Sequence, residues 1–245
     1  MNKYKHEELV HNLDAPREIV PVINELLKPK SVVDIGCGIG TFLKVFKEAG
    51  VVEVLGIDGK WVNKKQLLNY IDLDEFIEHD LEKPLLLEKQ FDLVLSLEVA
   101  EHLSEESADI FVKNLINAGN LIIFSAAIPM QGGQNHLNEQ WLPYWESKFS
   151  KYDYMIHDVL RPIFWEQPKI NWWYKQNMVL ITPKDYILHN DLKVNPISKL
   201  VHYDLLCKKD KVLRDTKKRL KKIKRGEAGR LFYLKLLLKS LFKKL

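Results

Sequence analysis

Gly36, Gly38 and Gly40 alternate with other residues directly after the short apolar segment 31–35. A buried strand that runs into such a turn lets the backbone approach a ligand closely, because glycine has no side chain in the way. The G-x-G-x-G spacing differs from the G-x-G-x-x-G of dinucleotide sites, and the lysine of a P-loop is absent. The segment therefore predicts a nucleotide-like ligand that is neither a dinucleotide nor a triphosphate.

Two carboxylates narrow the choice of ligand. Asp34 precedes the glycines, and Asp58 ends the next apolar segment, 54–57. Asp34 would repel a pyrophosphate but could attract the ammonium group of an amino acid, and Asp58 could accept hydrogen bonds from both hydroxyls of a ribose. A ligand that combines a ribose with an amino acid and carries no phosphate is S-adenosylmethionine, which is the predicted cofactor.

Over about residues 20–185 the chain resembles the class I S-adenosylmethionine-dependent methyltransferases. Segments 76–81, 91–103 and 121–125 resemble the third, fourth and fifth strands of that family, in order and at strand–helix spacing. The resemblance implies that Asp80, at the end of the third strand, meets the adenine amino group. We expect the cofactor site to consist of Asp34, Gly36, Cys37, Gly38, Gly40, Asp58, Asp80, Leu81 and Glu98.

These residues also have ordinary structural interpretations. Asp58 and Asp80 could cap helices, Cys37 could only fill space in the core, and Glu98 could pair with His102 in a loop. The joint pattern, rather than any single residue, favours the cofactor site.

Strand-like and helix-like segments alternate through the first 125 residues. We expect helices near 15–28, 41–49, 63–70 and 105–118, and strands near 31–35, 52–57, 75–79, 91–96 and 120–125. This alternation predicts an α/β fold with a doubly wound, mostly parallel sheet, as in the Rossmann-like methyltransferases. Ligands of such sheets bind outside the carboxyl ends of the strands. The glycine loop, Asp58, Asp80 and Glu98 all follow predicted strands, so they should share one site.

The alternation ends at residues 127–149, which are rich in hydrogen-bonding and aromatic side chains. Asn138 could cap a helix that carries the aromatic residues of 141–149 largely on one face, although these aromatics could instead complete the core. In class I methyltransferases this region builds the acceptor pocket. The resemblance therefore implies substrate contacts by Asn135, Asn138, Glu139, Gln140, Trp141 and Trp145.

Methyl transfer to an alcohol needs a base that removes the hydroxyl proton. His136 is the first candidate, because imidazole titrates near working pH and the residue lies in the acceptor segment, and His102 is the second. Either histidine could instead be a hydrogen-bonded structural residue. No group of His, Asp and Glu has the spacing of metal ligands, so we expect no required metal.

The motif Asn-His-x-Asn-Glu-Gln-Trp at 135–141 and the run 172–178 resemble small bacterial methyltransferases associated with surface-glycan biosynthesis. We expect the run 172–178 to lie in the antiparallel strand pair that closes the family's sheet, with 178–182 as its buried end. The resemblance implies O-methylation of a sugar or sugar-linked group of a surface polysaccharide. The alternatives are methylation of a lipid-linked small molecule such as a quinone precursor, methylation of RNA, and a non-catalytic binding protein.

The C-terminal residues 201–245 carry 16 Lys and Arg against 4 Asp and Glu, a net charge of +12, whereas the first 200 residues carry −8. We therefore expect a methyltransferase domain over 1–198 and a basic helical tail over 199–245. Lys235, Lys239 and Lys243 recur every fourth residue beside an apolar face that extends to Leu245. This pattern is typical of a helix that lies in a membrane interface.

An anionic membrane is therefore the predicted partner of the tail, and the alternative is that the helix docks on the same chain or on a partner protein. Nucleic acid is disfavoured, because an RNA channel would line the active site with positive charge and the body of this chain is acidic. The two cysteines, Cys37 and Cys207, imply no disulfide framework. The first eight residues lack the apolar stretch of a signal peptide, and no apolar run could span a bilayer. We expect a cytoplasmic protein with peripheral attachment to the inner face of the cytoplasmic membrane.

Overall fold

The computed structural model describes residues 12–187 and 194–242, so residues 1–11, 188–193 and 243–245 lie outside the described part. The predictions about a signal peptide, about Lys243 and about Leu245 concern residues that lie outside the described ranges. The chain divides into two compact units, Met1–Leu200 and Val201–Leu245. The assignment of residues 1–198 to a methyltransferase domain and of residues 199–245 to a basic tail stays a prediction.

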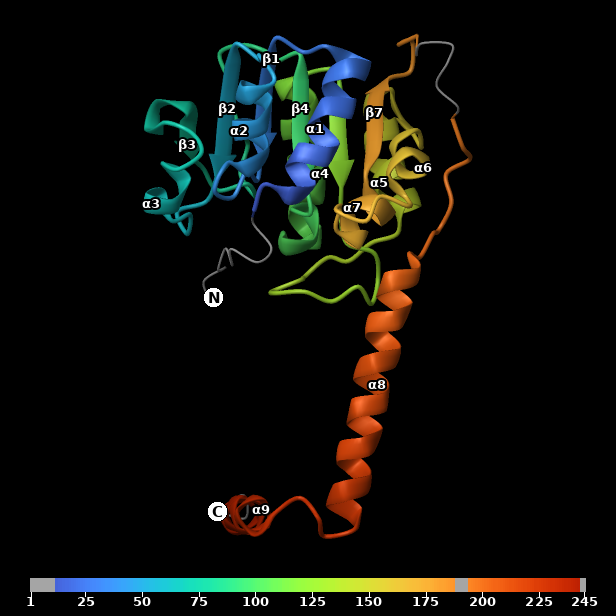
Figure 1. Ribbon diagram of the computed structural model, residues 1–245. Helices are drawn as coiled ribbons and strands as arrows, with labels where there is room; N and C mark the ends of the chain where they lie inside the picture. The colour runs from blue at the N-terminus through green and yellow to red at the C-terminus, as the bar shows by residue number, and fades with distance from the viewer. Residues whose placement is uncertain (1–11, 188–193, 243–245) are drawn as a thin grey trace. The chain divides into compact units, whose positions relative to one another are not determined.

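The first unit is built on a seven-stranded sheet with the strand order β3-β2-β1-β4-β5-β7-β6 (Figure 1). Along the part β3-β2-β1-β4-β5 each strand pairs in parallel with the next, whereas β7 is antiparallel to both β5 and β6. The predicted doubly wound, mostly parallel sheet is therefore confirmed. The strands are β1 (Ser31–Ile35), β2 (Glu53–Asp58), β3 (Phe76–Glu78), β4 (Leu93–Leu97), β5 (Ile122–Ser125), β6 (Tyr154–His157) and β7 (Val179–Pro183).

Helices cover both faces of this sheet. They are α1 (Asp14–Leu27), α2 (Thr41–Glu48), α3 (Lys64–Leu67), α4 (Ala108–Ala118), α5 (Leu142–Phe149), α6 (Leu160–Phe164) and α7 (Trp172–Asn177). Helices α1 and α2 pack in the hydrophobic cluster that contains Val32 of β1, and α4 and α5 pack in a second cluster that contains Val33. Adjacent residues of one strand thus belong to different clusters. Because both faces of the sheet are covered, the central strands are apolar throughout instead of alternating between apolar and polar residues.

Strands β1 and β4 lie side by side, although β2 and β3 separate them in the sequence. At such a reversal of strand order the following loops diverge and leave a crevice at the carboxyl edge of the sheet, where ligands of doubly wound folds bind. The segments that follow β1, β2, β4 and β5 therefore form the candidate site.

Two local predictions are wrong. Asn138 does not cap a helix, because α5 begins at Leu142 with Pro143 in its first turn, where proline needs no amide donor. The run Trp172–Asn177 forms helix α7 rather than a strand, and only Val179–Pro183 forms the predicted antiparallel strand. The aromatic residues of the run favour a strand locally, but tertiary packing overrides such a preference.

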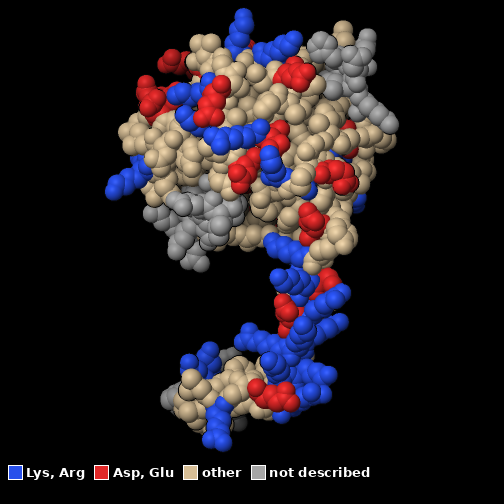
Figure 2. All heavy atoms as spheres, in the orientation of Figure 1, with Lys and Arg blue, Asp and Glu red and all other residues tan. Residues whose placement is uncertain are grey.

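The described part of the second unit consists of α8 (Tyr203–Lys224) and α9 (Arg230–Phe242). Lys and Arg side chains are dense along α8 (Figure 2). Helix α9 exposes the side chains of Leu231, Leu234, Leu236, Leu237, Leu238 and Leu241. The predicted basic helical extension is therefore present. Among the residues that the structure describes, no helix combines the length and apolar character needed to cross a membrane.

Candidate active site

The loop after β1 depends on glycines with left-handed backbone conformations. Gly36, Gly38 and Gly40 have φ angles of +94°, +56° and +85°. A Cβ at Gly36 would lie 2.3 Å from Cγ2 of Val99, in the turn after β4. The two loops therefore pack directly against each other at the reversal of strand order, and only glycine permits the contact.

Asp58 ends β2 with its carboxylate turned toward the glycine loop. Its Oδ2 accepts a hydrogen bond from the amide of Gly38 at 2.8 Å, and its Oδ1 accepts one from the amide of Gly59 at 2.6 Å. Burial raises the pKa of Asp58 to about 6. The next helix, α3, is capped by Asn63, so Asp58 is not a helix cap. The side chain of Trp61 also interacts with this carboxylate, whose remaining acceptor capacity could serve a ribose hydroxyl.

Asp34 is a second buried carboxyl group close to the loop. It lies in β1 and is 3% exposed. Burial, reinforced by the negative charge of Asp58, raises the pKa of Asp34 to about 8. A buried carboxylate of this kind is stabilised by a cationic donor such as the ammonium group of an amino acid. Asp34 and Asp58 together fit a ligand with an ammonium group and a ribose, as S-adenosylmethionine has.

The other predicted cofactor residues differ in their surroundings. Cys37 is buried, and burial raises the pKa of its thiol well above the ordinary value, so it packs as a neutral thiol. Leu81 is buried in the core, whereas Asp80 is exposed and accepts from the amide of Glu82 at 3.1 Å in a turn, not at a helix start. Their contacts with a cofactor stay predictions.

Glu98, directly after β4, is held in a buried polar network. Its φ of +55° is unfavourable for a residue with a side chain. Its carboxylate accepts from Nε2 of Gln131 at 2.8 Å and from Nδ2 of Asn177 at 3.0 Å, and burial raises its pKa to about 7. Nε2 of Gln176 donates to Gln131 at 3.1 Å. The sequence interpretation gave these three amide side chains no role in the site, although Gln131 lies in the acceptor segment and Gln176 and Asn177 lie in the run 172–178.

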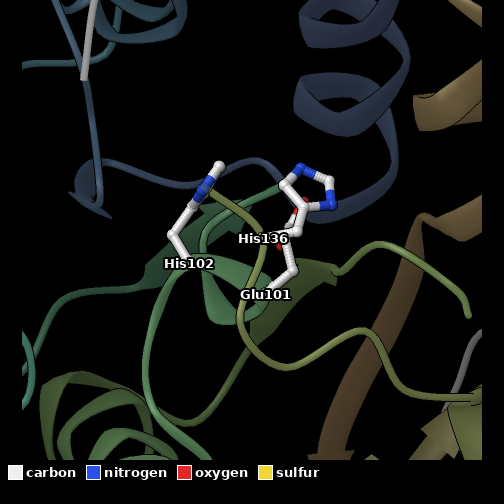
Figure 3. A group of neighbouring side chains, drawn as sticks. All are labelled: Glu101, His102 and His136. Atoms are coloured by element: carbon white, nitrogen blue, oxygen red, sulfur yellow. The ribbon is translucent and has the colours of Figure 1, made fainter. Parts of the chain in front are cut away.

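Two histidines and a buried carboxyl group gather where the turn after β4 meets the loop after β5 (Figure 3). Glu101 and His102 belong to the short 3₁₀ turn Ala100–His102, and His136 lies in the loop. The imidazole rings of His102 and His136 lie edge to face with their centroids 4.9 Å apart. The structure thus brings both predicted catalytic histidines together. It adds Glu101, for which the only sequence signal was its position next to His102.

Glu139 organises the loop that carries His136. Its Oε1 lies 2.8 Å from Nδ1 of His136, and two backbone amides of the same loop donate to the carboxylate at 2.6 and 2.7 Å. The amide of Leu137 also donates to the backbone carbonyl of Glu101 at 2.7 Å, which ties the two loops together. Because a carboxylate only accepts, Nδ1 of His136 carries the proton and Nε2 is left as an acceptor in the neutral ring.

The remaining predicted acceptor residues are dispersed. Trp145 is 1% exposed and lies in the hydrophobic core, which favours the alternative that it completes the core. Asn138 is also buried and its Oδ1 accepts from Nε2 of Gln140 at 2.9 Å. Asn135 is exposed and Trp141 is half-buried. Substrate contacts by these residues stay predictions.

Comparison with known proteins gives the family. Residues 9–177 match the model of a family described as a methyltransferase domain. The chain is 23% identical over 205 residues to the mitochondrial ubiquinone biosynthesis O-methyltransferase of Dictyostelium discoideum, covering 75% of this chain and 56% of the relative. The chain therefore spans about half the length of that curated relative.

Two solved structures share the fold at low identity. Magnesium protoporphyrin IX methyltransferase from Synechocystis PCC 6803 with bound SAH has a TM-score of 0.52 and 14% identity, with 74% of this chain and 89% of that chain covered. PKMT2 from Rickettsia typhi in complex with AdoHcy has a TM-score of 0.51 and 12% identity, with 71% and 54% covered. The matched domain and the fold agree with the geometry of the loops after β1 and β2. This chain belongs to the methyltransferase-domain family, whose cofactor is S-adenosylmethionine.

Proposed function

We propose that this chain transfers a methyl group from S-adenosylmethionine to a hydroxyl group of an acceptor that binds against the loop after β5. One observation supports the proposal: the candidate cofactor-binding residues and the histidine cluster lie at the same edge of the sheet. The glycine loop, Asp34 and Asp58 lie after β1 and β2, and the histidine cluster lies after β4 and β5. The contact of Gly36 with Val99 joins the two halves of this site.

The chemistry requires orientation and removal of one proton. When bound, S-adenosylmethionine supplies a methyl group on a positively charged sulfur, which is already an activated leaving group. Asp34, Asp58 and the glycine loop would hold it, and it would supply the methyl carbon to the acceptor oxygen, with the electron pair of the broken carbon–sulfur bond kept by sulfur. Positioning in line provides much of the rate. His136, with Nδ1 held by Glu139 and Nε2 available, would take the hydroxyl proton, with His102 beside it.

A sugar or sugar-linked group of a bacterial surface polysaccharide is the first proposed acceptor. The loop that carries His136 presents the polar side chains of Asn135 and Glu139 and the half-buried ring of Trp141. Amide and carboxylate groups can bind several hydroxyls, and an aromatic ring can stack on a sugar face. This acceptor is supported mainly by the motif at 135–141.

A lipid-linked phenol of the quinone-precursor type is the second proposed acceptor. It is favoured by the similarity to a ubiquinone biosynthesis O-methyltransferase, although that relative is only 23% identical. The tail supports an acceptor at a membrane surface, since α9 combines exposed leucines with Lys235 and Lys239. We therefore also propose peripheral attachment of the chain to an anionic membrane through this helix.

The test is an acceptor screen with S-adenosylmethionine labelled in its methyl group. The full-length chain is offered nucleotide sugars, polysaccharide fragments, polyprenylated phenols and RNA, and the labelled atom is identified by mass spectrometry. We expect label on a hydroxyl oxygen of a sugar or phenol. Label on RNA would overturn the proposed acceptor class. Cofactor binding without transfer to any acceptor would favour the non-catalytic alternative.

A paired variant tests the role of the histidine cluster in the same assay. His136→Ala should lower turnover by about 100-fold, because activation of the hydroxyl is lost, while calorimetry shows unchanged affinity for S-adenosylmethionine. The half-buried residue His79, whose Nε2 lies 3.3 Å from the carbonyl oxygen of Lys83, offers a matched control, and His79→Ala should leave turnover within about twofold of the original chain. Normal turnover of His136→Ala would exclude His136 from the activation of the acceptor.

A further inference from the structure

Glu101, His102 and His136 offer ligand atoms that all lie within 4.8 Å of one another. Figure 3 shows that the three side chains come from two separate loops and approach a common region. Two imidazoles and one carboxylate form a donor set that proteins use for divalent first-row transition metals. Three protein ligands also leave coordination positions open for a substrate.

A buried oxygen of Glu101 supplies an independent observation. Glu101 is 1% exposed, its Oε2 receives no hydrogen bond from a nitrogen or hydroxyl donor among the described residues, and the nearby carboxyl group of Glu98 adds a negative charge. A buried acceptor without a donor is unfavourable, and more so when it is charged. A cation between this oxygen and the two imidazoles would satisfy the oxygen and neutralise its charge.

His136 is also oriented in the way that metal-binding histidines are. Its Nδ1 lies 2.8 Å from the Glu139 carboxylate, and its side chain is only 11% exposed. A Cβ at Gly133 would lie 2.0 Å from Nε2, so the loop can pack against the ring only because residue 133 is glycine. Ligating histidines almost always donate their other ring N–H to a carboxylate, which fixes the ring and its tautomer.

We propose that Glu101, His102 and His136 bind one divalent transition-metal cation, such as Mn²⁺ or Zn²⁺. The spacing in the sequence did not indicate this site, because His136 follows His102 only after the whole of α4 and β5. The role of the cation, but not its binding, rests on the proposed function. An acceptor hydroxyl at an open coordination position has a lower pKa, so it loses its proton to water and its oxygen attacks the methyl carbon more readily. His136 is then a ligand rather than the base.

The experiment measures cation binding to the metal-free full-length chain without any acceptor. Mn²⁺ is followed by electron paramagnetic resonance, in which the signal of the free ion disappears on binding, and Zn²⁺ is followed by calorimetry. We expect one cation per chain and a coupling of bound Mn²⁺ to imidazole nitrogen. Glu101→Gln, His102→Ala and His136→Ala should each weaken binding by at least about tenfold. The matched control His79→Ala should retain the original affinity.

The proposal would be overturned if the original chain bound neither Mn²⁺ nor Zn²⁺. It would also be overturned if the variant that combines Glu101→Gln, His102→Ala and His136→Ala bound the cation as tightly as the original chain. Circular dichroism establishes that each variant is folded. Glu139→Gln keeps the three ligands and changes only the partner of His136, so it should weaken binding by about 10–100-fold even if a ligand variant fails to fold. Because binding is measured without turnover, a failed acceptor screen would contradict the proposed function and leave this result standing.

Discussion

Asp34→Asn should make the cofactor-free chain more stable, by an amount that grows with pH. Burial and the neighbouring charge of Asp58 raise the pKa of Asp34 from 3.8 to about 8 in the folded state. Between these values the folded chain binds one more proton than the unfolded chain, so the contribution of this group lowers stability as pH rises. Asparagine has nearly the same shape and does not titrate, so it removes the loss of stability that comes from ionising the buried Asp34.

The magnitude follows from the two pKa values. At pH 5 the original chain loses about 2 kcal/mol relative to a chain without this titration, and at pH 7 it loses about 4 kcal/mol. The difference in unfolding free energy between Asp34→Asn and the original chain should therefore widen by roughly 2–3 kcal/mol from pH 5 to pH 7. The side chain is only 3% exposed, so solvent screening reduces this figure little.

The assay is denaturant unfolding followed by tryptophan fluorescence at pH 5, 6 and 7. All 6 tryptophans lie between Trp61 and Trp173, so the signal reports the first unit and not the helical tail. The control is Asp74→Asn, which makes the same chemical change at an exposed position. A gap between Asp34→Asn and the original chain that stays constant from pH 5 to pH 7 would refute the reasoning.

Two further outcomes test the cofactor loop and the tail. Gly36→Ala should destabilise the first unit by more than about 2 kcal/mol and abolish calorimetric binding of S-adenosylmethionine, because a Cβ would lie 2.3 Å from Val99 in a backbone with φ +94°. Gly226→Ala, with φ +76° and no atom within 4 Å of the added Cβ, is the matched control and should leave cofactor affinity unchanged; equal losses in the two variants would contradict the packing argument. The full-length chain should co-sediment with vesicles that contain phosphatidylglycerol, and Lys235→Glu with Lys239→Glu should reduce binding by about 1 kcal/mol or more per residue. Equal sedimentation of the two proteins would exclude an electrostatic attachment through α9.

Much of the fold could be predicted from the sequence, because its signals are local. Apolar strands that alternate with helices predicted the parallel sheet, and every helix and strand expected before residue 125 is present, with the predicted ends at Ser31–Ile35 and shifted ends elsewhere. The largest shift is in the helix expected at 63–70, which is the single turn α3. The run Trp172–Asn177 was misread, because a local preference for strands does not register the packing that makes it a helix.

The residues of the candidate site likewise differ in how far the sequence predicts them. Local pattern is enough to predict the glycine loop and its two carboxyl groups, because a left-handed turn between a strand and a helix needs glycine, and Asp34 and Asp58 lie in or at the end of neighbouring strands. The contact of Asn177 with Glu98, 79 positions away, and the meeting of Glu101 and His102 with His136 follow from the packing of the folded chain. Side chains on separate loops converge because the order of strands in the sheet places those loops together. Residue spacing along the chain does not indicate that order.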